Sequence, residues 1–172
     1  MKRIFQIVLV TLVTAKGAIC FADCSCEDWV KKSGYCVDYV KSRIPVFPVP
    51  KDVSEIKALS NKEIKDVDIG DVAIFHYRNF WHVAYVEKVH LDQKGNATAV
   101  DVSEMNFGPR IDFQQFKKKW GLTSQSEWKR AHCCGITSNY DQTAIREKID
   151  LNAINQIWSA EFAGFQNFKL GS

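Results

Sequence analysis

The pattern of hydrophobic and polar positions predicts two antiparallel strands over residues 70–89. Two runs rich in Val, Ala, Ile, Phe and Tyr flank a polar break at residues 78–79, which is typical of strands joined by a tight loop. Successive residues of a strand point to opposite faces, so His82, Ala84 and Val86 are expected on one face. The sequence therefore places a histidine at the beginning of the second strand, on a face that otherwise carries small apolar residues.

A helix is predicted upstream, beginning near Ser33 and ending before Pro45, because serine is a good N-cap and proline stops a helix. Its apolar residues recur at helical spacing on one face: Cys36, Val37, Val40 and Ile44. Cys36 would then lie in the first turn, where free backbone N–H groups and the helix dipole favour a thiolate. The alternative interpretation is that Cys36 is a small buried apolar residue.

A third strand is predicted over residues 97–104, after a turn at residues 92–96. An antiparallel register centred on that turn puts His82 opposite residues 104–106, which include Glu104 and Asn106. A carboxylate or an amide at this position could hold the imidazole through its second nitrogen.

The rest of the chain gives weaker expectations. We expect a short helix near residues 54–59, a helix over 111–119, a strand over 126–136, and one or two amphipathic helices over 141–162 with inward-facing Ile145, Ile149, Ile154 and Trp158. There is no internal repeat or long linker. The organisation expected is therefore one domain over residues 23–140, followed by a C-terminal helical extension over 141–172.

The first 22 residues have the layout of a secretory signal peptide. Lys2 and Arg3 precede an apolar run over residues 4–13, and small residues follow up to Ala22. Cleavage is expected after Ala22, with Gly17 as the alternative. A retained membrane anchor is the competing interpretation, but the run is short for a spanning helix and polar residues interrupt it.

Removing this leader changes the charge of the protein. The whole chain of 172 residues has a formal net charge of +3, and the leader contains three basic residues and no acidic one. The mature chain would have twenty basic and twenty acidic residues, so nucleic acid is not expected as a partner. We expect an exported protein, periplasmic or secreted, without stable membrane insertion after the leader is removed.

Five cysteines remain in the mature chain, and an odd number in an exported protein leaves one thiol unpaired. Four of them form two close doublets, at Cys24 and Cys26 and at Cys133 and Cys134. A disulfide within either doublet would strain the chain, so pairing between the doublets is favoured and Cys36 remains free. The alternative is a zinc site formed by the doublets, with His132 adjacent.

A free thiol at the beginning of a helix, a strand histidine and an orienting polar residue together suggest a cysteine nucleophile with its base. The order of these residues resembles the CHAP family, the cysteine, histidine-dependent amidohydrolases/peptidases. The resemblance covers about residues 30–110 and is carried by four short stretches, at residues 34–40, 70–75, 82–87 and 102–106.

This resemblance implies an α+β, papain-like fold in which an N-terminal nucleophile helix packs on an antiparallel sheet. It also implies an enzyme that hydrolyses amide bonds in the peptides of peptidoglycan, as an amidase or an endopeptidase. Cys36 would be the nucleophile, His82 the general base, Glu104 the residue that orients His82, and Asn106 a further polar member of the site.

Two positions depart from the family pattern. Trp81 stands where the family often has glycine before the histidine, and Tyr35 stands where it often has glutamine before the nucleophile. Both residues are therefore candidates for binding substrate. If glutamine holds the oxyanion in the relatives, this chain must use another donor, such as the backbone N–H of Cys36.

No metal or other cofactor is required by this chemistry. Some relatives bind calcium, and Asp23, Glu27 and Asp28 are acidic residues near the nucleophile helix. Peptidoglycan or muropeptides are the expected partners. Two other functions remain open at this point: an inactive module that binds peptidoglycan, and a toxin or effector directed at a rival's envelope.

Overall fold

The structure is a computed structural model that describes residues 24–50, 53–77, 80–121 and 123–166. The predicted signal peptide, Asp23 and the polar break at residues 78–79 lie outside the described residues. Within those ranges, none of the helices has the length and apolar character needed to cross a bilayer.

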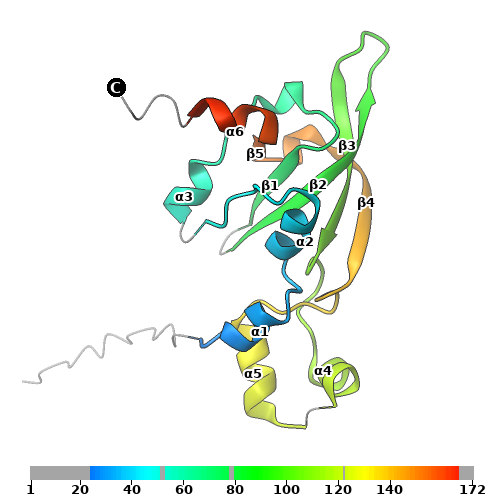
Figure 1. Cartoon of the computed structure of the whole chain (residues 1–172). Helices are drawn as coiled ribbons and strands as arrows, with labels where there is room; N and C mark the ends of the chain where they lie inside the picture. The colour runs from blue at the N-terminus through cyan, green and yellow to red at the C-terminus, as the bar shows by residue number, and fades with distance from the viewer. Residues whose placement is uncertain (1–23, 51–52, 78–79, 122, 167–172) are drawn as a thin grey trace, which may run out of the picture.

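An antiparallel sheet of five strands forms the centre of the molecule (Figure 1). The strands are β1 (Val72–Tyr77), β2 (Phe80–Leu91), β3 (Ala97–Met105), β4 (Thr143–Asp150) and β5 (Gln156–Trp158), in the spatial order β4-β3-β2-β1-β5. The predicted hairpin and third strand are confirmed as β1, β2 and β3. Together with the helices, this sheet makes the protein an α+β structure, as expected.

The helices form two groups. The first group lies near the sheet and contains α2 (Cys36–Arg43), α3 (Val53–Lys57) and, after β5, α6 (Ala160–Gln166). Two short 3-10 turns are η1 (Ile64–Asp66) and η2 (Leu151–Ala153). The second group gathers beyond one end of the sheet in Figure 1: α1 (Glu27–Lys31), α4 (Phe113–Trp120) and α5 (Gln125–Cys133). We call this second group the cap lobe.

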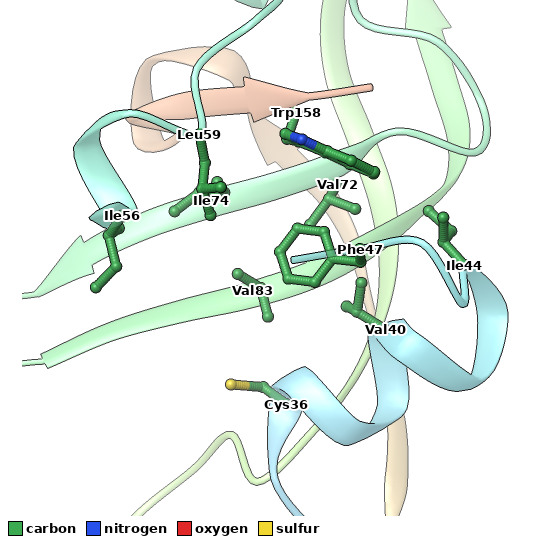
Figure 2. Packing of buried hydrophobic residues seen from close by; sticks show 10 residues of the cluster. All are labelled: Cys36, Val40, Ile44, Phe47, Ile56, Leu59, Val72, Ile74, Val83 and Trp158. Carbon is green, nitrogen blue, oxygen red and sulfur yellow. The ribbon is translucent and has the colours of Figure 1, made fainter. Parts of the chain in front are cut away.

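Each side of the sheet has its own apolar cluster, and the cap lobe has a third. Figure 2 shows the cluster between α2 and the sheet, where Val40 and Phe47 pack against Val72, Val83 and Trp158. Full burial of a side chain of this size contributes about 1.5–3 kcal/mol, so this cluster holds α2 firmly on the strands. The cap lobe is aromatic, and its centre is the indole of Trp29.

The strand expected over residues 126–136 is wrong, because residues 125–133 form helix α5. Ser124 is its N-cap, and the Ser124 hydroxyl accepts a hydrogen bond from the backbone N–H of Glu127. This local capping signal favours a helix, and a strand assignment based on apolar residues alone did not take it into account.

The helical extension expected over residues 141–162 is also wrong for most of its length. Residues 143–150 form β4, which pairs with β3, and residues 156–158 form β5, which pairs with β1. Ile154 and Trp158 face inward as expected, but Ile145 is 65% exposed. The long-range pairing with β3 overrides the local helical pattern, and the only α-helix after β4 in the described residues is α6, which begins at residue 160.

Candidate active site

The helix α2 begins at Cys36, which is 8% exposed and is the free cysteine of the described chain. The N-cap is Tyr35 rather than Ser33. The backbone N–H of Tyr35 donates to the carboxylate of Asp38, 3.1 Å away, as in a capping box. Figure 2 shows the Cys36 side chain at this end of α2, beside the strands. The sulfur therefore lies where unpaired backbone N–H groups of a helix begin.

A hydrogen-bonded network fixes α2 against β2 and β3. The Tyr39 hydroxyl donates to the Ser103 hydroxyl at 2.8 Å, and the Ser103 hydroxyl donates to Glu87 at 2.6 Å. Arg43 donates to the same carboxylate at 2.6 Å and covers the ring of Tyr85. Because α2 is held at several points along its length, the position of Cys36 relative to β2 is fixed by the fold.

His82 lies at the beginning of β2 and is almost completely buried, with 3% of its surface exposed. The pairing of Tyr85 with Ser103 sets the register of β2 and β3 and brings His82 to Glu104. Nε2 of the ring lies 2.9 Å from Oε2 of Glu104. The Phe107 ring packs on His82 with 5.0 Å between the ring centroids.

The protonation state of His82 reflects three neighbouring effects. Burial alone lowers the pKa of His82, but the charge and hydrogen bond of Cys36, together with the hydrogen bond and charge of Glu104, outweigh burial and raise the pKa to about 9. The ring is therefore an imidazolium at neutral pH. Because Nε2 donates to Glu104, Nδ1 is the ring nitrogen left for Cys36.

Glu104 on β3 has no exposed surface and is held from two sides. It accepts from His82 and from Arg146 of β4, whose Nε and Nη2 lie 2.5 and 2.8 Å from the two carboxylate oxygens. Burial raises the pKa of Glu104, but the hydrogen bonds and charges of His82 and Arg146 outweigh it, so the pKa is lowered overall. Glu104 is therefore a buried carboxylate between two cations.

Arg146 was missed by the sequence analysis, because residues 141–162 were expected to be helical. Ala144 pairs with Glu104 across the sheet, and Arg146, two residues further on, lies on the same face of β4. The β-branched residues Thr143, Ile145 and Ile149 fall at alternate positions, and this is the sequence signal that could have identified the strand.

Asn106 has other partners than the predicted ones. Its amide donates to the carbonyl of Gly135 at 3.1 Å and accepts from the backbone N–H and the hydroxyl of Thr137 at 2.9 and 3.0 Å. The backbone of Asn106 is left-handed, with φ 53°. The structure thus brings Cys36, His82 and Glu104 together, and uses the Asn106 side chain to attach the end of β3 to the loop after α5.

The two residues expected to bind substrate, Tyr35 and Trp81, pack in different parts of the molecule. The Tyr35 hydroxyl donates to the carbonyl of Cys134 at 3.0 Å, and its ring packs on Tyr140 in the cap lobe. Burial, reinforced by nearby negative charge, raises the pKa of Tyr35 above its usual range. Trp81 is half-buried and packs against the same apolar cluster as Cys36.

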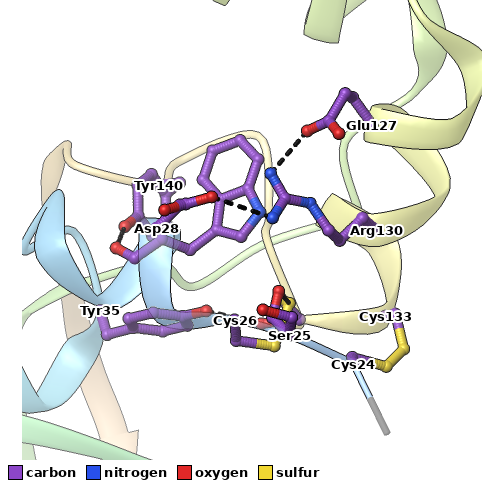
Figure 3. The surroundings of a disulfide bond; sticks show 12 residues. Cys24, Ser25, Cys26, Asp28, Tyr35, Glu127, Arg130, Cys133 and Tyr140 are labelled. Carbon is purple, nitrogen blue, oxygen red and sulfur yellow. Dashed lines mark hydrogen bonds and ion pairs between the residues drawn. A yellow bond between two sulfur atoms is a disulfide. The ribbon is translucent and has the colours of Figure 1, made fainter. Parts of the chain in front are cut away.

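The cysteine doublets pair with each other, as expected. One disulfide joins Cys24 to Cys133 (Figure 3), and the other joins Cys26 to Cys134. This pairing contradicts the alternative of a zinc site. The disulfides join residues 24 and 26 to the end of α5, and they fit a protein that folds in an oxidising compartment.

In the parts of the chain that the structure describes, no three His, Cys, Asp or Glu side chains gather as a metal site. Two of the three acidic residues considered for calcium are at the beginning of α1, and Asp28 forms an ion pair with Arg130 at 3.0 Å. The third, Asp23, lies outside the described residues.

Comparison with models of protein families, with curated proteins and with solved structures finds no match for this chain.

Proposed function

We propose that the chain is an exported cysteine hydrolase that cleaves amide bonds in peptidoglycan peptides. The observation that carries this proposal is the free Cys36 at the beginning of α2, beside an imidazole whose other nitrogen is held by Glu104. A thiol, a base and an orienting group in this order are what nucleophilic catalysis by cysteine requires.

The proposed reaction has two stages. In the first, the Cys36 thiolate attacks the amide carbonyl, and the His82 imidazolium gives its proton to the leaving amine as the C–N bond breaks. In the second, His82 takes a proton from water, which attacks the thioester, and the acid product leaves while Cys36 is regenerated. Glu104 keeps the ring oriented in both stages, and backbone N–H groups at the beginning of α2 stabilise the oxyanion.

The α+β arrangement supports this proposal, because a papain-like fold of the CHAP type, which the sequence resemblance implies, would have the same arrangement of helix and sheet. The nucleophile helix α2 packs on an antiparallel sheet that carries the histidine and its carboxylate on neighbouring strands. The disulfides and the predicted signal peptide agree with action in the periplasm or outside the cell. The cap lobe and strand β4 lie outside the stretches that resemble the family.

Digestion of purified peptidoglycan tests the proposal. The mature protein should release soluble muropeptides, iodoacetamide should block the release, and EDTA should spare it. Mass spectrometry of the products distinguishes an amidase, which frees the peptide from the sugar, from an endopeptidase, which cuts within the peptide. Lysis retained by Cys36→Ala, or binding of muropeptides without cleavage by the unmodified protein, would overturn the proposal.

A further inference from the structure

Glu104 is ionised in a place where a carboxylate is costly. It has no exposed surface, and moving an isolated carboxylate into such surroundings costs several kcal/mol unless it is paired and hydrogen-bonded. His82 supplies one donor, to Oε2. Arg146 supplies two, one to each oxygen. The arginine thus provides most of the hydrogen bonds that keep Glu104 charged.

The geometry of Arg146 also fixes the direction in which Glu104 points. A planar guanidinium that donates through Nε and Nη2 to both carboxylate oxygens is a two-point contact, which sets the carboxylate plane. Because Oε2 accepts from both Arg146 and His82, the rotation of Glu104 determines the rotation of the imidazole. Arg146 has no contact with Cys36 among the described interactions, so its effect on the thiol passes through Glu104 and His82.

The aromatic ring of Phe107 packs against this group of side chains. The guanidinium carbon of Arg146 lies 3.8 Å from the centroid of Phe107, and Phe107 packs on His82. The Phe107 carbonyl accepts from the Asn139 amide at 2.7 Å. The Phe107 ring therefore packs on both His82 and Arg146, the two partners of Glu104, and its backbone is attached to the loop that follows α5.

We infer that Arg146 is a positioning residue of the candidate active site, which holds Glu104 as an oriented carboxylate on Nε2 of His82. The inference deepens the proposed function and rests on it for its catalytic meaning. A purely structural role for Arg146 would join β4 to β3 without affecting the ionisation of Glu104.

The ionisable groups around Glu104 are few enough for this distinction to be measured. From β2 it faces His82, from β4 it faces Arg146, and α2 brings Cys36 to the far side of the imidazole. The other elements that pack on β3 add little: Lys65 and Asp66 of η1 and Glu147 and Lys148 of β4 are exposed, and η2 has no ionisable side chain.

The test is an NMR titration of the Glu104 side-chain carboxyl carbon, identified by its loss in Glu104→Gln. In the unmodified protein the midpoint should lie below the ordinary value of 4.5, or remain unreached until the protein unfolds. In Arg146→Met it should rise by at least about one pH unit, because a neighbouring opposite charge lowers a carboxyl pKa by about 1–3 units. Arg146→Lys, which keeps the charge, should recover part of the shift.

Arg130→Met is the matched control, because Arg130 also donates to carboxylate oxygens from two guanidinium nitrogens, but to Asp28 and Glu127 in the cap lobe. It should leave the Glu104 midpoint unchanged. A midpoint in Arg146→Met equal to that of the unmodified protein would overturn the inference, whatever happens to the melting temperature. If Arg146→Met does not fold, Arg146→Lys decides the question: an unshifted midpoint together with an unchanged alkylation rate of Cys36 would count against the inference.

Failure of the proposed function would look different. If the protein does not digest peptidoglycan but the Glu104 midpoint depends on Arg146, the positioning role of Arg146 stands and the proposed substrate is wrong. If the protein digests peptidoglycan through Cys36 but Arg146→Met does not shift the Glu104 midpoint, the proposed function stands and the role of Arg146 is wrong.

Discussion

Nε2 of His82 lies 2.9 Å from Oε2 of Glu104, and both side chains are buried between strands. His90 has the same type of partner, with Nε2 2.6 Å from Asp101, but that pair is partly exposed and lies further along β2. One strand therefore carries two histidine–carboxylate pairs, and in the first of them Cys36 raises the pKa of the histidine.

The two pairs provide an internal comparison for the role of His82. His82→Ala should reduce hydrolysis by at least about 10²-fold, because it removes the group that transfers protons in both stages. His90→Ala should leave hydrolysis within about twofold of the unmodified protein, because a partly exposed pair contributes little. Initial rates of muropeptide release measure both variants, and equal losses in the two would argue against the assignment of His82.

Stability should depend on pH through His82. The pKa of His82 is raised from 6.5 to about 9 on folding, so its contribution is fully present below about pH 6.5 and is lost as pH rises to about 9. The contribution amounts to roughly 3 kcal/mol at most. Urea unfolding at a series of pH values should show the free energy of unfolding falling over this range.

The variant for this experiment is His82→Gln, in which the fall between pH 6.5 and 9 should become shallower. Glu104 affects the pH dependence of stability at acidic pH. Its pKa is lowered on folding, so the stability that it contributes is lost as pH falls below about 4.5. An identical pH dependence in the variant and the unmodified protein would show that His82 is not the titrating group.

The two disulfides should behave as one constraint. They join positions separated by 109 and 108 residues, and their ends are one or two residues apart. Either bond alone closes nearly the same loop, so removing one by Ser substitution should cost less than about 2 kcal/mol, while removing both should cost about 4–5 kcal/mol. Urea unfolding of the two double variants and the quadruple variant measures this, and additive losses would contradict it.

A substitution at Asn106 tests whether this residue has a structural role or takes part in the chemistry. Asn106→Gly keeps the left-handed backbone that glycine adopts freely and removes the three hydrogen bonds of the amide to Gly135 and Thr137. We expect a loss of about 1–3 kcal/mol in stability, with the catalytic rate at a temperature well below unfolding reduced by less than about fivefold. A loss comparable to that of His82→Ala at that temperature would place Asn106 in the chemistry.

The part of the site that the sequence predicts well is the part that depends on local patterns. Strand alternation places His82, the turn at residues 92–96 sets the approximate register, and helical spacing places Cys36 at the beginning of α2. The odd cysteine count predicts that Cys36 is free, and the close doublets predict pairing between them.

The part that was missed depends on long-range pairing. The apolar residues at 145, 149, 154 and 158 fit a helical pattern, but β4 obtains its stability from hydrogen bonds to β3, which a local pattern does not contain. Because residues 141–162 were expected to be helical, Arg146 was not predicted as a partner of Glu104. Asn106 was assigned to the site because the expected register put it near His82 and the family resemblance implied a polar residue there. The structure instead pairs its amide with the loop at residues 135–137.

The measurement that tests the central claim most directly is the detection of an acyl-enzyme on Cys36. The protein is mixed with purified muropeptides, quenched in acid during turnover and analysed by mass spectrometry. We predict a covalent adduct with the mass of the acyl part of the substrate, located on the peptide that contains Cys36 and absent from Cys36→Ala. Product formation by Cys36→Ala at the rate of the unmodified protein, without any adduct, would contradict the account.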